Sequence, residues 1–201
     1  DKPLASSCKL IDDKYIDDIW NIFQKFLKIS KGFDDNEGNN EEEENRNQNL
    51  LLMQCRKRCF SIIKAAIPFL NKLVSTPAVC SQLIDLLLNA DRFFNSEVYN
   101  ILILLYQYYY FAAADHIQPI FNFTINDLKS NQNKYIISAL NFWISMSEIE
   151  SNILKRQKCI KINCFTQGAY PIIITYLFEI LEKIDLEKKD DLLYDDQSIL
   201  E

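Results

Sequence analysis

Hydrophobic residues recur along this chain with the 3.6-residue period of an α-helix, in one block after another. In the first block, Ile16, Ile19, Trp20 and Phe23 fall on one side of a helix, and polar residues fill the other side. Short polar turns separate the blocks, and only 3 Gly and 5 Pro are present, too few to punctuate an all-β chain. The sequence therefore predicts an all-α fold, with helices over residues 15–30, 50–74, 77–89, 97–113, 116–129, 135–147 and 167–184.

Proline and capping residues mark several of the predicted boundaries. Pro68 has no backbone N–H and is expected to kink or split the block 50–74. Thr76 is followed by Pro77, which suits the first position of a helix. The sequence from Asn95 to Glu97 is expected to cap the next helix, which is apolar nearly all round and therefore central. Residues 148–163 are more polar and are expected to be only partly helical, and residues 185–196 are expected to form a loop.

The order of the blocks predicts successive antiparallel helix pairs, stacked as an α-α superhelix of the HEAT-repeat kind. First helices begin near residues 15, 77, 117 and 167, and the middle separation is close to the ~40–47 residues of such repeats. We expect residues 1–201 to form a single solenoid segment of about four pairs, with a truncated last repeat at 185–201. A four-helix bundle is the alternative architecture.

Charge is concentrated in one segment of the chain. Residues 32–49 are acidic and rich in Asn, which predicts a disordered insertion. The whole chain carries a formal net charge of −6, and the remainder outside this segment has 21 acidic and 21 basic residues. A neutral remainder offers no basic surface for phosphate backbones, so we expect no nucleic-acid partner.

The candidate chemistry is sparse. The six cysteines lie mostly in apolar helical blocks and are expected to be free thiols, with neither disulfides nor a metal site. His116 is the single histidine, and neither a phosphate-binding glycine loop nor a paired nucleophile is visible, so we expect no enzyme and no cofactor. The most apolar block, residues 99–114, is too short to cross a bilayer, so membrane insertion is not expected.

Several motifs in the second half of the chain occur in a recognisable order. Tyr106-Gln107-Tyr108 near the end of one helix is followed by a helix containing Thr124-Ile125 and ending in Lys129-Ser130. Phe142-Trp143 lies in the next helix, and Gly168-Ala169 opens another that leads into an acidic segment. This order resembles the fifth to eighth HEAT repeats of importin-β, the karyopherin nuclear import receptor family. The resemblance covers residues 105–196, and the first half fits by helix order only.

The resemblance implies a transport receptor that shuttles between cytoplasm and nucleus. Its implied partners are the Phe-Gly repeats of nucleoporins, the GTPase Ran, and the basic segment of an importin-α-like adaptor or cargo. Two features depart from the family. Lys188 and Lys189 interrupt the acidic run, in which Tyr194 stands where the family has Trp, and the insertion at residues 32–49 is not typical. A general HEAT-repeat interaction scaffold with no transport role is the alternative function.

Two sets of candidate site residues follow from the resemblance. Phe-Gly segments would bind between first helices of neighbouring pairs, at Ile19, Trp20, Phe23, Val79 and Leu83, unless these residues pack in the interior. Ran or the adaptor would contact the acidic segment at Asp185, Glu187, Asp190, Asp191, Asp195 and Asp196, unless that segment is only a solvated linker.

Overall fold

The structure, a computed structural model, describes residues 18, 21, 22, 24, 25, 43–69, 77–130, 132–156 and 164–198. These residues contain helices and no strand, so the predicted all-α fold is confirmed for them. The elements are α2 (Glu43–Ala66), η1 (Ile67–Phe69), α4 (Pro77–Leu88), η2 (Arg92–Phe94), α5 (Asn95–Ala113), η3 (Ala114–His116), α6 (Ile117–Leu128), α7 (Asn133–Arg156) and α8 (Phe165–Ser198), where η denotes a short 3-10 helix.

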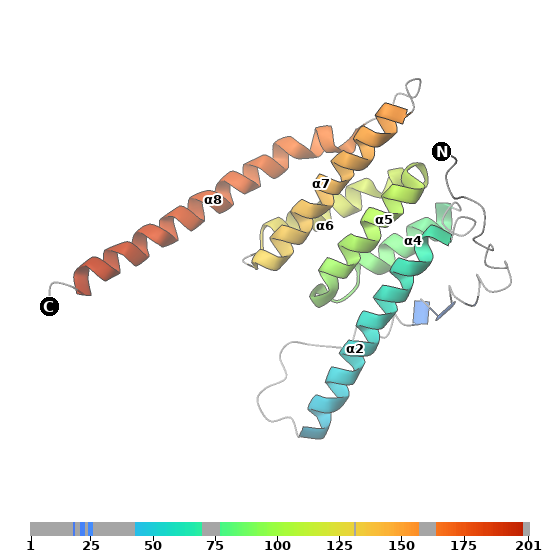
Figure 1. Cartoon of the computed structure of the whole chain (residues 1–201), viewed down its shortest axis with the longest axis horizontal. Helices are drawn as coiled ribbons and strands as arrows, with labels where there is room; N and C mark the ends of the chain where they lie inside the picture. The colour runs from blue at the N-terminus through green and yellow to red at the C-terminus, as the bar shows by residue number, and fades with distance from the viewer. Residues whose placement is uncertain are drawn as a thin grey trace, which may run out of the picture.

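The helices alternate between two layers along the chain. Helices α2, α5 and α7 lie side by side in one layer, with α4 and α6 behind them (Figure 1). Helix α5 packs against α2, α4 and α7, and α7 packs against α5, α6 and α8. Helix α6 also contacts α8 directly. Helices α5, α6 and α7 thus each contact a helix of their own pair and one of the next, as expected for an α-α superhelix.

Helix α5 is central, as predicted from its sequence, which is apolar nearly all round. Leu102, Leu105 and Tyr106 are completely buried in it. The rings of Tyr99 and Tyr106 lie 5.8 Å and 6.2 Å from the ring of Phe142 on α7, within the range of favourable aromatic contacts. Aromatic packing between α5 and α7 therefore joins one helix pair to the next.

The predicted break at Pro68 is confirmed. Helix α2 ends at Ala66, and Pro68 lies in the 3-10 turn Ile67–Phe69. The hydroxyl of Tyr109 donates a hydrogen bond of 2.7 Å to the carbonyl oxygen of Ile67, which ties this turn to α5. The backbone of Tyr109 itself departs from helical geometry (φ −133°, ψ 37°), so α5 is kinked where it meets the turn.

Helix α7 is longer than the sequence predicts. It runs to Arg156 as one helix, so the end predicted at residue 147 is too early. Residues 148–156 of the stretch expected to be partly helical are helical, and residues 157–163 lie outside the described part of the chain. Met146 and Glu150 are buried, and Ile149 and Ile153 pack against the core. The buried side of the helix therefore continues through a polar stretch, because a buried glutamate occupies one of its inward positions.

Two other boundaries differ from expectation for a similar reason. Helix α2 begins at Glu43, inside the segment 32–49 that was predicted to be a disordered insertion, and residues 32–42 lie outside the described part of the chain. Helix α8 continues to Ser198, so residues 185–196 are helical and the predicted loop is wrong. Residues such as Glu and Lys are good helix formers, so a charged stretch can extend a helix already started by an apolar one.

Asn95 does not cap α5 as the sequence suggests. The residue before the helix is Phe94, which makes no side-chain capping bond. The Asn95 amide instead donates to both carboxylate oxygens of Asp127, at 3.0 Å and 2.8 Å, and the hydroxyl of Tyr99 donates to the same carboxylate at 2.9 Å. The Nη2 atom of Arg92 lies 3.5 Å from Oδ1 of Asp127 and forms an ion pair with it. The end of α6 is thus tied to the start of α5 by a buried carboxylate.

This carboxylate generates a prediction of pH dependence. Burial raises the pKa of Asp127 above its ordinary value of 3.8, although the bonds from Tyr99 and Asn95 and the charge of Arg92 act in the opposite direction. A raised pKa in the folded state stabilises the fold most below the ordinary pKa, and this contribution is lost as pH rises through the folded value.

We therefore expect the free energy of unfolding of the parent, relative to an Asp127→Asn variant, to decrease as pH rises from about 4, the ordinary pKa of Asp. Urea unfolding at a series of pH values measures this difference. Asp85→Asn, at an exposed position of α4, is the control for the removal of one carboxylate. A parent-minus-Asp127→Asn difference that increases with pH would contradict the assignment.

Candidate binding groove

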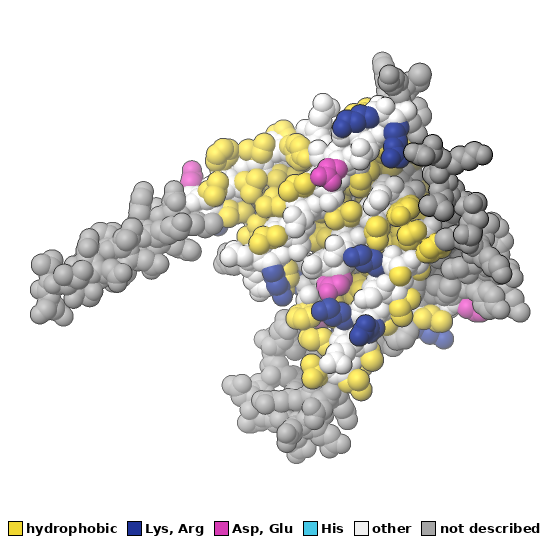
Figure 2. All heavy atoms as spheres, in the orientation of Figure 1, with side chains coloured by type: hydrophobic (Ala, Val, Ile, Leu, Met, Phe, Trp, Pro, Cys, Tyr) yellow, Lys and Arg dark blue, Asp and Glu magenta, His cyan; other side chains and the backbone are white. Residues whose placement is uncertain are grey.

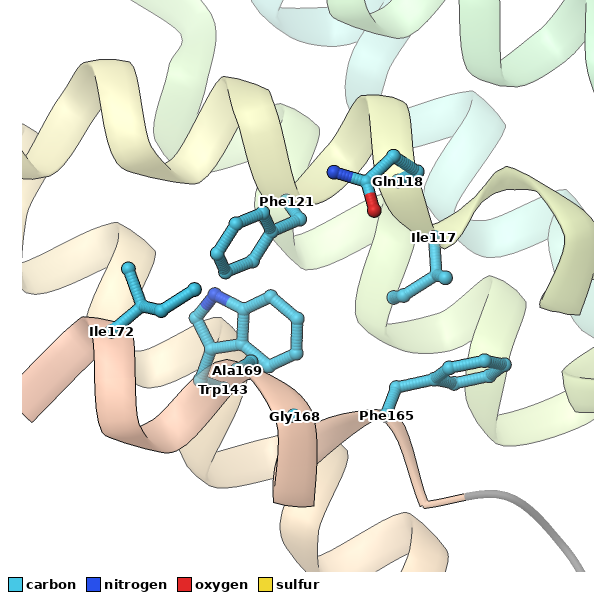
Figure 3. Close-up of a pocket in the computed structure, with 8 residues that line it drawn as sticks. All are labelled: Ile117, Gln118, Phe121, Trp143, Phe165, Gly168, Ala169 and Ile172. Atoms are coloured by element: carbon cyan, nitrogen blue, oxygen red, sulfur yellow. The ribbon is translucent and has the colours of Figure 1, made fainter.

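An apolar groove of about 310 Å³ lies between α6 and α8, with α7 as its floor. Figure 3 shows the side chains that line it, which come from all three helices. Its volume is at the lower end of the range for ligand pockets, so it has room for one or two side chains rather than a folded ligand. The lining residues are Ile117, Gln118, Phe121, Trp143, Phe165, Gly168, Ala169 and Ile172.

Helix α6 supplies one wall of the groove. Ile117 and Phe121 are one helical turn apart and therefore project from the same side of α6. Gln118 is the polar member of this wall, and its Nε2 atom donates a hydrogen bond of 3.2 Å to Oδ1 of Asn122. Its carbonyl oxygen points toward the groove in Figure 3. The wall thus combines apolar surface with one hydrogen-bond acceptor.

Trp143 forms the floor and is fixed from below. Its side chain is 1% exposed, and its indole N–H donates a hydrogen bond of 3.0 Å to the hydroxyl of Thr124. Thr124 in turn donates to the carbonyl oxygen of Phe121 at 2.7 Å. The rings of Phe121 and Trp143 meet edge to face, with their centroids 5.8 Å apart. Because the indole N–H is already satisfied, the floor is rigid and apolar.

Helix α8 supplies the opposite wall through Phe165, Gly168, Ala169 and Ile172. These residues recur at helical spacing and therefore lie on one side of α8. Ala169 is buried, whereas the side chain of Ile172 is 45% exposed at the rim. The ring of Phe165 packs against Tyr110, with centroids 5.8 Å apart. The position of this wall consequently depends on how the first turn of α8 is held.

Glu150 of α7 holds that first turn. Its carboxylate is 2% exposed and accepts hydrogen bonds from the backbone N–H groups of Phe165 at 2.8 Å and Thr166 at 3.3 Å. It also accepts a close hydrogen bond from the Thr166 hydroxyl and one of 3.0 Å from the hydroxyl of Tyr110. Burial, followed by the nearby Glu150 carboxylate, raises the pKa of Tyr110, so this phenol stays protonated and remains a donor.

The described residues contain no candidate metal centre: none of them form a group of three or more His, Cys, Asp or Glu side chains able to hold a metal ion. Burial raises the pKa of Cys80 to about 11, and it raises the pKa of Cys59 as well, so both thiols are protonated near neutral pH. Among the helices described, none combines the length and the apolar character needed to span a bilayer.

The structure describes only some of the residues that the sequence predicts to line a Phe-Gly groove. Ile19, Trp20 and Phe23 lie outside the described residues. Val79 is partly buried and packs against the core, and Leu83 is 1% exposed within it. The expectation that Leu83 lines an open groove is therefore wrong, because its side of α4 faces the interior of the stack.

The predicted acidic site lies on α8. The residues concerned belong to its C-terminal part, and their side chains lie outside the described part of the structure. Contact of these residues with Ran or an adaptor stays a prediction, and the segment that would make it is a helix rather than the expected loop. The residues are Asp185, Glu187, Asp190, Asp191, Asp195 and Asp196.

The sequence did not identify the groove between α6 and α8 or the role of Glu150. Helical spacing places Ile117 with Phe121, and Phe165 with Ile172, but does not show that the two sides face each other across Trp143. Glu150 lies in a polar stretch, where nothing in the pattern separates a buried glutamate from exposed ones such as Glu148.

In comparisons with known proteins, no family model, no curated protein and no solved structure matches this chain.

The Glu150 contacts predict a specific loss of stability. Glu150→Ala should lower the free energy of unfolding by roughly 2–4 kcal/mol, because it leaves several buried donors without an acceptor. Glu148→Ala, at an exposed position of the same helix, should change it by less than about 0.5 kcal/mol. Urea unfolding gives both values. Hydrogen exchange should show faster exchange at the Phe165 and Thr166 amides in Glu150→Ala, and unchanged protection there would rule out the capping role.

Proposed function

We propose that this chain is part of an α-solenoid binding scaffold of the importin-β type, and that the groove between α6 and α8 receives a Phe side chain from nucleoporin Phe-Gly repeats. The supporting observation is the position of the groove. It opens between the first helices of successive pairs, and its lining is mostly apolar, with three aromatic residues among the eight. The resemblance in residues 105–196 assigns Phe-Gly binding to this kind of location.

The shape of the groove suits weak and rapidly reversible binding. It is small, so a bound side chain buries little surface and affinity stays low. Its floor and both walls are held by internal hydrogen bonds, so little ordering is needed when a ligand enters. A receptor that moves through a pore needs many such brief contacts, and low affinity with fast release meets that need.

The acidic end of α8 extends the proposal to the other partners. Carboxylates spaced along a helix attract Lys and Arg side chains of a basic adaptor or cargo segment, or of Ran, mainly by speeding association. Lys188 and Lys189 weaken this field, so we propose a modest contribution. The proposed receptor shuttles between cytoplasm and nucleus.

A general interaction scaffold is the second candidate, and the other layer of the stack favours it. Tyr108 and Phe111 on α5 and Ile144 on α7 are each at least half exposed. Figure 2 views the layer of α2, α5 and α7, where apolar side chains alternate with Lys and Arg. A mixed surface of this kind suits protein partners generally, with no need for Phe-Gly recognition.

Titration with a Phe-Gly repeat peptide tests the proposed function. Ile172→Glu, which places a charge in the groove, should weaken binding by about 1–2 kcal/mol, five- to thirtyfold. Ile174→Glu is a matched control, because Ile174 is similarly exposed on α8 but does not line the groove. Amide chemical shifts report binding, with a Ser-Gly peptide as the negative control. No binding of the Phe-Gly peptide to the parent would refute Phe-Gly recognition and favour the general scaffold.

The acidic segment is tested by changing Asp190, Asp191, Asp195 and Asp196 together to Asn. Charged side chains that make no buried contact contribute less than about 0.5 kcal/mol each, so we expect the fold to persist. Association with a Lys- and Arg-rich adaptor peptide should become slower and less dependent on salt. Stopped-flow mixing at low and high salt measures both effects. Equal rates for parent and variant at each salt concentration would show that the segment takes no part in binding.

A further inference from the structure

The glycine in the groove wall is not required by the fold itself. Gly168 lies in the first part of α8, and no glycine of the described chain has a positive φ angle. A Cβ atom built on Gly168 would meet no atom within 4 Å. Neither the backbone nor the packing therefore demands glycine, although glycine is a poor helix former and alanine would favour α8.

The space beside Gly168 belongs to the groove. Gly168 lines it together with Phe165 on the same helix and Phe121 on the opposite wall. Figure 3 shows Gly168 between the side chains of Phe165 and Trp143. Any side chain at position 168 would project into the space that these three rings surround. Glycine at position 168 thus makes α8 less stable than alanine would, but it leaves the volume of the groove open at this point.

The lining of this space selects for an aromatic ring. The rings of Phe121 and Phe165 are partly exposed in the groove, and a further ring can meet them edge to face or offset, at centroid distances of about 4.5–7 Å. The oxygen of Gln118 points toward the same space and can accept a hydrogen bond from a peptide N–H. An aromatic residue within an extended peptide offers both groups together.

We propose that Gly168 is a specificity-determining residue, whose missing side chain admits the aromatic ring of a peptide ligand while Gln118 accepts a hydrogen bond from the ligand backbone. The inference rests on the proposed function for the groove and adds the reason for its preference. Gly168 sets the space available to the ring, and Gln118 distinguishes a peptide from a simple apolar molecule.

Two variants separate a binding role for Gly168 from a structural one. Gly168→Ala should raise the melting temperature, because alanine favours the helix and its Cβ meets no neighbour, yet it should weaken ligand binding several-fold. Gly168→Leu should weaken binding by at least about tenfold, as expected when the place of an anchor residue is filled. Gln167→Leu, at the exposed neighbouring position outside the groove, is the control and should bind as the parent does.

The probes are N-acetylphenylalaninamide, N-acetylleucinamide and a Phe-Gly repeat peptide, followed by amide chemical shifts at Gln118 and Gly168 or its replacement. The phenylalanine amide should perturb these signals at lower concentration than the leucine amide, and Gln118→Leu should weaken its binding. Equal affinity of the parent and Gly168→Leu for the phenylalanine amide would overturn the inference, as would failure of that probe to perturb the groove. Selective binding of the phenylalanine amide without binding of the Phe-Gly peptide would support the inference and refute the proposed function.

Discussion

The buried carboxylate of Glu150 is the interaction on which the arrangement of the last helices depends. A helix begins with backbone N–H groups that have no partner inside the helix, and two of those of α8 are satisfied by a glutamate from α7. The same carboxylate accepts from Tyr110 of α5, so three helices meet at one side chain. Asp127 plays a similar part between α6 and α5. Polar contacts thus fix the angle at which apolar helices pack.

Apolar packing and polar contacts between helices therefore differ in how well the sequence predicts them. Apolar periodicity alone places the helices, and Pro68 and Pro77 mark a break and a start because proline acts on its own backbone. Asn95 and Glu150 are different, since their roles depend on partners elsewhere in the chain. Asn95 resembles a cap in sequence but pairs with Asp127, and the sequence cannot show which of two functions an amide serves.

The residues that line the candidate groove are also difficult to predict from the sequence. The resemblance suggested where apolar grooves occur in the architecture, between first helices, and the structure has such a groove between α6 and α8. The residues that the resemblance suggested do not line this groove: Leu83 is in the core, and Ile19 and Trp20 lie outside the described residues. Lining residues follow from which turn of one helix faces which turn of another, a relation between distant segments that a local pattern does not contain.

Contacts limited to neighbouring helices have a consequence for how the protein comes apart. Among the described helices, α4 contacts α5, and α8 contacts α6 and α7, so the loss of one such junction leaves the contacts between the other helices in place. Such a stack can open from an end while its middle stays folded, and the slowest amides to exchange should lie in α5 rather than in α8. Damage at a junction would then alter the reach and curvature of the stack before it destroys any single helix.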